Sequence, residues 1–331
     1  MRRREFIAGL GSAAAWPLAA QAQQPERMRR IAVLIGDLAE NDPTGIASVS
    51  AFTRALEQLG WTDGRNVRVD IRWASADVEL NAKFAKELVG FRPDVILSES
   101  TPGTAAVKRE TKTIPIVFVM VADPIGEGFA ANLAHPGGNL TGFTYVESSM
   151  IGKWFQLLTE IAPDIKRVAM IFNPATAPGG GSYFLPFFET AARSFRVEAI
   201  TAPVHSDADI ESVITAVGRE PQGGFLLQAD AFVMAHRAQI ITVAAKNNVP
   251  AVYPWLPFPR EGGLLSYGSD LEDIWRRSAL YVDRILRGAK PESLPVQLPV
   301  KFYMALNVKT ANALGLTVPP TLRAIADEVI E

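Results

Sequence analysis

The 331-residue chain contains no cysteine. This absence excludes disulfide bonds, thiolate nucleophiles and metal sites with cysteine ligands. Histidine is also scarce, and His135, His205 and His236 lack the spacing of a metal site. We therefore expect no bound metal.

Signatures of common enzyme classes are missing as well. Residues 36–39 follow the first predicted strand and read Gly-Asp-Leu-Ala, so no G-x-G-x-x-G motif for a dinucleotide is present there. The chain has no P-loop motif, and Ser266 lacks the spacing of a nucleophile elbow. We expect neither a cofactor nor catalysis.

The chain also lacks long apolar segments and clustered charge. No segment after the N-terminus approaches the ~20 apolar residues that cross a bilayer as a helix. Lysine plus arginine number 33, against 35 aspartate plus glutamate. A nucleic-acid-binding surface would leave a basic cluster, so we expect no nucleic-acid partner.

The first residues read as an export signal. Residues 2–4 are three arginines, residues 7–18 form a short apolar stretch rich in alanine and glycine, and residues 20–22 read Ala-Gln-Ala, a pattern that signal peptidase cleaves. Residues 3–7 also resemble a twin-arginine signal, although arginine stands before them where serine or threonine is usual. We predict that residues 1–22 direct export to the periplasm, with the twin-arginine pathway as the indicated route.

The remaining 309 residues repeat their own pattern. This length exceeds the ~250–300 residues at which one core usually splits, so two lobes are expected. Three pairs of similar segments lie 137, 130 and 135 residues apart, and they are marked by Arg30 and Arg167, Leu97 and Leu227, and Pro115 and Pro250. A nearly constant offset indicates two copies of one topology.

The repeated segments predict an α/β fold. Short runs rich in valine and isoleucine, apolar at consecutive positions, are typical of parallel strands buried on both faces. Segments with helical spacing separate them, which predicts two doubly wound parallel-sheet lobes joined by a hinge. Ligands bind such sheets at the carboxyl ends of the strands, and two facing lobes can close around a ligand.

We expect the chain to cross between the lobes near Gly142 and Gly268, although both are also consistent with ordinary turns. The predicted N-terminal lobe comprises residues 28–143 plus 269–298, and the predicted C-terminal lobe comprises 144–268 plus 299–331.

Polar residues at predicted strand ends are the candidate ligand contacts. Ser100 and Thr101 precede a helix, where hydroxyls and free N–H groups can bind a carboxylate or phosphate, or can serve only as a cap. Asp123 and Asp230 follow strands, where each can receive an ammonium or hydroxyl group, or can cap a helix. Tyr267, at another strand end, is the best aromatic candidate. Phe172, Tyr253 and Trp255 gather at the same edge and suit a flat or amphipathic small molecule.

Several strings resemble a known family, the bacterial ABC-transporter substrate-binding proteins that include predicted tryptophan- and tyrosine-binding members. They are residues 60–67 (GWTDGRNV), 114–117 (IPIV), 123–126 (DPIG), 136–142 (PGGNLTG), 262–268 (GGLLSYG), 281–291 (YVDRILRGAKP) and 314–320 (LGLTVPP).

The resemblance implies a type I periplasmic-binding fold, an amino-acid-like and often aromatic ligand, and delivery to a permease with an ATPase partner. Carried over by position, it implies a cleft formed by Thr101, Asp123, Asn139, Thr141, Asp230 and Tyr267. One position departs from the family, because Ser100 stands where members usually have glycine. The side chain narrows the approach to the backbone there, which leaves open a ligand other than an aromatic amino acid.

Our first hypothesis is a monomeric periplasmic receptor. The ligand's carboxylate would meet Ser100 and Thr101, and Asp123 or Asp230 would meet its amino group. Tyr267 and Trp255 would pack on its apolar part. A second hypothesis is an exported enzyme on the same scaffold that uses Asp123 and Asp230 as an acid–base pair. A third is a sensory ligand-binding protein.

Overall fold

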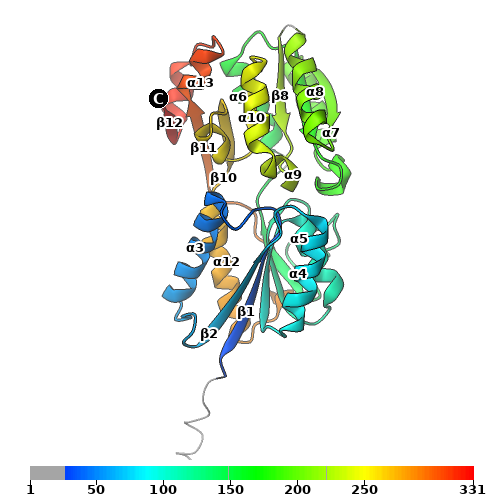
Figure 1. The fold of residues 1–331 in the computed structure, drawn as a ribbon, viewed down its shortest axis with the longest axis vertical. Coiled ribbons are helices and arrows are strands. Elements are labelled where there is room, and N and C mark those ends of the chain that lie inside the picture. Colours follow the sequence, from blue (N-terminus) through cyan, green and yellow to red (C-terminus); the bar gives the residue numbers. More distant parts are fainter. Residues whose placement is uncertain (1–26, 148, 221) are drawn as a thin grey trace, which may run out of the picture.

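The computed structural model describes residues 27–147, 149–220 and 222–331, so the predicted export signal lies outside the described residues. The chain forms two lobes stacked along its long axis, each built on a sheet with helices on both faces (Figure 1). Within the described residues, no helix is both long and apolar enough to cross a bilayer.

The first sheet has five parallel strands in the order β2-β1-β3-β4-β5. The strands are β1 (Arg29–Ile35), β2 (Val67–Trp73), β3 (Val95–Glu99), β4 (Ile116–Val121) and β5 (Leu140–Thr144). One helix pair that packs together is α3 (Pro43–Gln58) with α12 (Leu271–Leu286); the other is α4 (Val78–Gly90) with α5 (Thr101–Glu110). Figure 1 shows the two pairs on opposite faces of the sheet.

The second sheet has seven strands in the order β12-β11-β10-β9-β8-β6-β7, and only the pairing of β10 with β11 is antiparallel. The strands are β6 (Arg167–Phe172), β7 (Glu198–Pro203), β8 (Gly223–Leu227), β9 (Ala251–Tyr253), β10 (Leu265–Ser269), β11 (Phe302–Asn307) and β12 (Glu328–Ile330). The α-helices are α6 (Met150–Ile161), α7 (Leu185–Phe195), α8 (Asp207–Arg219), α9 (Ala231–Ala235), α10 (Arg237–Lys246), α11 (Pro257–Arg260), α13 (Val308–Ala313) and α14 (Pro320–Ile325). Two 3-10 turns are η2 (Pro178–Gly181) and η3 (Pro291–Ser293).

The internal repeat is visible in the strand orders. β2-β1-β3-β4-β5 of the first sheet corresponds to β7-β6-β8-β9-β10 of the second. The fold prediction of two doubly wound parallel sheets is therefore confirmed. β11 and β12 have no counterpart in the first lobe, so the repeat gave no signal for them or for the antiparallel pairing.

Burial along the strands follows from the helices on both faces. All six residues of the inner strand β4 are buried, whereas β7 at the edge of the second sheet is mostly exposed. A strand of consecutive apolar residues is stable only where helices cover both faces of the sheet. The apolar sequence of β4 therefore predicts an inner position in the sheet, whereas the more polar sequence of β7 fits an edge.

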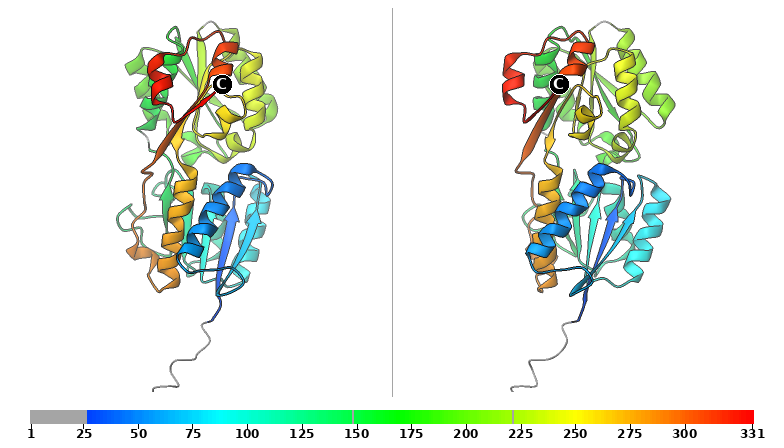
Figure 2. Two further views of the ribbon diagram at one scale, coloured as in Figure 1. Left: turned by 90° about the vertical axis from the view of Figure 1, so that its left-hand side faces the viewer. Right: turned by 60° about the vertical axis from the view of Figure 1, so that its left-hand side comes forward.

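Three segments cross between the lobes: the first follows β5, the second joins β10 to α12, and the third precedes β11 (Figure 2). Hydrogen bonds tie them together. Ser269 Oγ donates to the carbonyl of Tyr145, the Thr144 amide donates to the Gln297 carbonyl at 2.9 Å, and the Asp270 amide donates to the Lys301 carbonyl at 2.9 Å. Movement of one lobe against the other therefore bends all three segments together.

Gly142 and Gly268 lie inside β5 and β10 and not in the crossing segments. A Cβ atom at Gly268 would lie 1.8 Å from the Pro254 carbonyl oxygen, and one at Gly142 would lie 2.0 Å from the Phe118 carbonyl oxygen. Close approach of neighbouring backbone, and not hinge flexibility, explains glycine at both positions.

Gly268→Ala is expected to destabilise the protein by about 1–3 kcal/mol, because the added methyl group overlaps backbone that cannot rotate away. The change is measured by chemical denaturation. Gly152→Ala in α6 is the matched control: no atom lies within 4 Å of its added Cβ, and alanine favours a helix by about 0.5–1 kcal/mol. Equal stability of Gly268→Ala and the wild type would contradict the packing described here.

Candidate functional site

The carboxyl ends of the inner strands of the two sheets face each other across two adjoining central cavities, each of about 10 Å³. Asp37, Met120 and Trp255 line both. The first is also lined by Ser100, Thr101, Pro102, Tyr145, Thr176, Pro178, Ala229, Asp230 and Ala231. The second is also lined by Leu38, Thr44, Ser48, Glu99, Met234, Leu271 and Trp275. A cavity of this size has room for about one water molecule, so the lobes are closely apposed.

On the side of the first lobe, two carboxyl groups meet at the ends of β1 and β3. Glu99 Oε2 accepts hydrogen bonds from the amides of Gly36 at 2.8 Å and Asp37 at 3.2 Å. Both acidic residues are buried, and Asp37 Oδ1 has no hydrogen-bond partner. Burial raises the pKa of Asp37 and, together with the neighbouring Asp37 charge, holds the pKa of Glu99 well above its usual range.

Ser100 begins the next element in an unusual conformation. Its φ of 69° lies in the left-handed region, which glycine adopts more easily. Its hydroxyl accepts from the Gly103 amide at 3.3 Å and so caps α5, while Thr101 starts the helix. The serine that departs from the family pattern therefore has a local role as a cap and also lines the first cavity.

On the side of the second lobe, Asp230 stands 130 residues after Ser100 and has the matching role. Its Oδ1 accepts from the Val233 amide at 3.0 Å, which caps α9, and from Thr176 Oγ1 at 3.0 Å. Its Oδ2 accepts from the Asn173 amide at 3.1 Å. Burial raises the pKa of Asp230 to about 6. Capping and cavity lining, which the sequence left as alternatives, occur together here.

Aromatic side chains also line the central cavities. Trp255 stacks on Tyr145, with ring centroids 6.0 Å apart and an interplanar angle of 19°. The Tyr145 hydroxyl, which comes from the first crossing segment, donates to the Ala229 carbonyl. Trp275 from α12 lines the second cavity. Flat aromatic rings therefore line the central cavities beside the polar residues at the strand ends.

Of the residues that the sequence predicted for the site, Ser100, Thr101, Asp230 and Trp255 line the central cavities. Asp123 does not: its Oδ1 accepts from the Gly126 amide at 2.8 Å, and the residue borders a separate cavity of about 280 Å³. The structure therefore does not bring Asp123 and Asp230 into one cavity as an acid–base pair.

Asn139, Thr141 and Tyr267 also lie away from the central cavities. Asn139 Nδ2 donates to the Ile114 carbonyl and Thr141 Oγ1 to the Leu294 carbonyl, both at 2.7 Å. Both residues stand at the amino end of β5, and the amino ends of parallel strands meet at the edge opposite the central cavities. The Tyr267 ring stacks on Phe302 at 5.8 Å within the second lobe.

Five residues that line the central cavities were not predicted from the sequence: Asp37, Glu99, Tyr145, Thr176 and Trp275. Asp37 and Glu99 carried a usable signal, because each stands where a run of buried strand residues ends. Tyr145 carried none, since its role depends on the path of the first crossing segment. Among the described residues, no group of three or more acidic or histidine side chains is placed to hold a metal ion.

Contacts between the lobes show that the structure is closed. Arg237 Nη2 of α10 pairs with Asp42 Oδ2, the cap of α3, at 2.7 Å, and both side chains are largely buried. The Gly179 amide of the second lobe donates to Glu127 Oε1 of the first at 3.2 Å. Arg237 Nε also pairs with Glu261 Oε1 within its own lobe at 2.8 Å, which positions the guanidinium.

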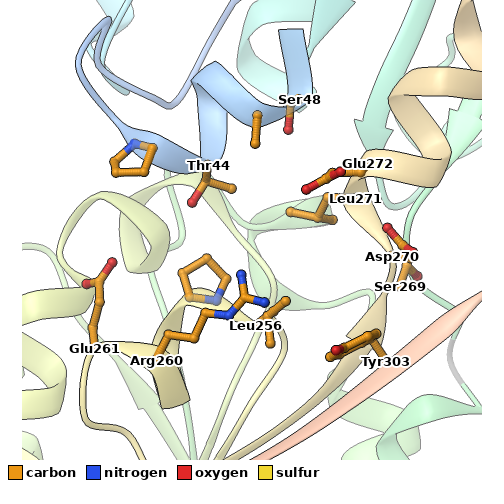
Figure 3. Close-up of a pocket in the computed structure, with 13 residues that line it drawn as sticks. Thr44, Ser48, Leu256, Arg260, Glu261, Ser269, Asp270, Leu271, Glu272 and Tyr303 are labelled. Atoms are coloured by element: carbon orange, nitrogen blue, oxygen red, sulfur yellow. The ribbon is translucent and has the colours of Figure 1, made fainter. Parts of the chain in front are cut away.

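A larger cavity of about 390 Å³ opens beside the crossing segments. Thr44 and Ser48 of α3 face Leu256 and Arg260 of the second lobe across it (Figure 3). Thr44, Ser48 and Leu271 line both this outer cavity and the second central cavity, so the two adjoin.

Asp42→Asn is expected to weaken the closed arrangement by about 1.5–3 kcal/mol, the range for a hydrogen bond to a charged group. Asparagine still caps α3 but leaves Arg237 without its partner in the first lobe. Small-angle X-ray scattering should show a larger radius of gyration. Glu261→Gln, which removes the partner of Arg237 within the second lobe, is the control and should not change the radius. Unchanged scattering for Asp42→Asn would contradict a latch role.

The raised pKa of Asp230 predicts a pH-dependent stability. The folded protein holds this proton up to about pH 6, whereas the unfolded chain releases it near its ordinary value of 3.8. Its contribution to stability is therefore fully present below about pH 4 and declines as the pH rises through 6, by about 3 kcal/mol for two pKa units. Asp230→Asn should flatten this part of the profile in denaturation series from pH 4 to 7. Asp37 and Glu99 affect the pH dependence of stability equally in the wild type and in Asp230→Asn, so the difference between the two stability profiles reports on Asp230 alone. Parallel profiles would refute the raised pKa of Asp230.

Three comparisons place the chain among known proteins. Residues 38–330 match the family described as ABC transporter substrate binding protein. A tyrosine-binding protein of Clostridioides difficile (strain R20291) is 25% identical over 266 residues, which cover 80% of this chain and 75% of that protein.

The structural comparison agrees. A conserved domain protein from Vibrio cholerae is 26% identical with a TM-score of 0.84, covering 92% of this chain and all of the other. A protein from Streptococcus pneumoniae in complex with L-Trp is 22% identical, also with a TM-score of 0.84, and the match covers 91% of this chain and 99% of that one. Since the family match extends from the end of the first strand almost to the last residue, the chain belongs to the ABC transporter substrate-binding protein family.

Proposed function

We propose that this protein is the extracytoplasmic solute-binding component of an ABC importer and that it captures a small amino-acid-like or aromatic organic molecule between its lobes. The observation that carries the proposal is the pair of central cavities at the carboxyl ends of both sheets, enclosed by the Asp42–Arg237 and Glu127–Gly179 contacts. Ligand site and closure contacts lie on the same facing surfaces, so binding and closing are coupled.

Ser100 and Thr101 from the first lobe and Asp230 from the second supply the polar contacts, and Tyr145 and Trp255 contact the apolar part of the ligand. Cavities of about 10 Å³ are too small for such a molecule, so it enters when the lobes separate by bending the three crossing segments. The outer cavity adjoins the second central cavity, so the ligand can pass through it to reach the space between the lobes.

The tyrosine-binding relative and the L-Trp complex support an amino-acid-like ligand. Delivery to a membrane permease with its ATPase, a monomeric state and a periplasmic location after removal of residues 1–22 complete the proposal. The sheets support the predicted lobe boundaries: α12 packs on α3 of the first lobe, whereas β10 and β11 on either side of it belong to the second sheet.

A thermal-shift screen against amino acids, aromatic acids, amines and small amides tests the function. A ligand at 100 times its dissociation constant stabilises a protein by about 2.7 kcal/mol. Thr101→Val should weaken the affinity for any hit by about 0.5–1.5 kcal/mol in calorimetry, because it removes one hydroxyl from the cavity wall. Asp123→Asn, in the separate cavity, should leave affinity unchanged. A screen without any hit, or turnover of a hit, would refute the proposal.

A further inference from the structure

The charges around the central cavities have one sign. Among the described residues that line them are three carboxyl groups, those of Asp37, Glu99 and Asp230, and no lysine, arginine or histidine. All three are buried, at 7%, 2% and 3% exposure. A negatively charged ligand group placed among them would meet like charge, without water to screen it, wherever these carboxyl groups are ionised.

Four backbone amides beside the cavities already donate to carboxyl groups of the protein. The amides of Gly36 and Asp37, at the end of β1, donate to the Glu99 carboxylate. In the second lobe, the amides of Asn173 and Val233 donate to the Asp230 carboxylate. The protein's own carboxylates thus occupy donors at the end of β1 and at the start of α9, whereas at the start of α5 the Gly103 amide donates to the Ser100 hydroxyl.

One acceptor is left over. Asp37 Oδ1 is buried and receives no N–H donor from the described residues; its carboxyl group can pair with that of Glu99 only while one of the two holds a proton, and Asp37 lines both cavities. A buried carboxylate oxygen without a partner is costly, and a ligand donor would satisfy it. The indole of Trp255 lines the same two cavities and offers an apolar surface to a ligand's carbon skeleton.

We propose that the ligand is an organic ammonium ion that carries no carboxylate, with its charged nitrogen between Asp37 and Asp230 and its carbon skeleton against Trp255. This proposal rests on the proposed function and narrows it from amino-acid-like or aromatic molecules to amines. The ammonium group gives Asp37 Oδ1 its missing donor. Glu99 keeps its amide bonds and adds negative charge, without itself needing to touch the ligand.

The protonation behaviour of the site agrees. Burial raises the pKa of Asp37, Glu99 and Asp230, and the neighbouring Asp37 charge raises that of Glu99 further. A bound cation stabilises the ionised carboxylates, so binding releases protons.

Two matched trios of probes test the proposal by isothermal titration calorimetry: tyramine, L-tyrosine and 3-(4-hydroxyphenyl)propionate, and tryptamine, L-tryptophan and indole-3-propionate. Each trio keeps the ring and changes only the charged groups. At least one amine should bind ten or more times more tightly than its amino acid, and the acids without an amine should not bind. An amino acid that binds as tightly as its amine overturns the inference but leaves the binding function standing. Failure of both amines overturns the inference, while the broader screen decides the function.

Charge-neutral variants locate the effect. Glu99→Gln keeps an oxygen for the Gly36 and Asp37 amides but removes the charge, and Asp37→Asn is a second, independent variant. Each should lower amine affinity tenfold or more and reduce the preference for amine over amino acid. Asp123→Asn, the matched acid outside these cavities, should leave that preference unchanged. Circular dichroism establishes that each variant is folded. Equal losses for amine and amino acid in both site variants overturn the inference, because a general loss of packing would affect both ligands alike.

Discussion

Backbone N–H groups at the carboxyl ends of parallel strands point out of the sheet and need acceptors, and here buried carboxylates fill that need. Glu99 takes the amides at the end of β1, and Asp230 takes those of Asn173 and Val233. These bonds fix the loops that form the facing surfaces of the two lobes. They also determine the character of the site, because the acceptors are carboxyl groups and, among the described residues, no lysine, arginine or histidine lines the central cavities with them.

The same facing surfaces hold the lobes together. Asp42 caps α3 and pairs with Arg237, so an element that orders the first lobe also contacts the second. Tyr145 leaves the first sheet through a crossing segment and donates to Ala229 in the second lobe. The same residues therefore order parts of the first lobe and hold the two lobes together.

The fold was predictable from the sequence because the repeat is built from short apolar strands at a nearly constant offset, and each strand's position in the sheet follows from its burial. The site was less predictable. Asp230 and Thr101 could be identified because they follow strands, but Asn139 and Thr141 stand at the amino end of β5 and so lie at the opposite edge. Glu99 is the last residue of β3, and only the three-dimensional path of β1 brings Gly36 and Asp37 to its carboxylate. Tyr267 lies in a strand, as predicted, but its ring packs on Phe302 of β11. The repeat could not reveal this contact because β11 has no counterpart in the first lobe.

The placement of α12 bears on how the chain reaches its native state. This helix belongs to the first lobe, where Trp275 meets Phe52 of α3 edge to face with centroids 6.4 Å apart, yet in the chain it follows β10, the fifth strand of the second lobe. A growing polypeptide that has completed β5 still lacks the layer that covers α3. The first lobe to be synthesised can therefore finish its hydrophobic core only after most of the second has emerged, so the two halves complete their folding together.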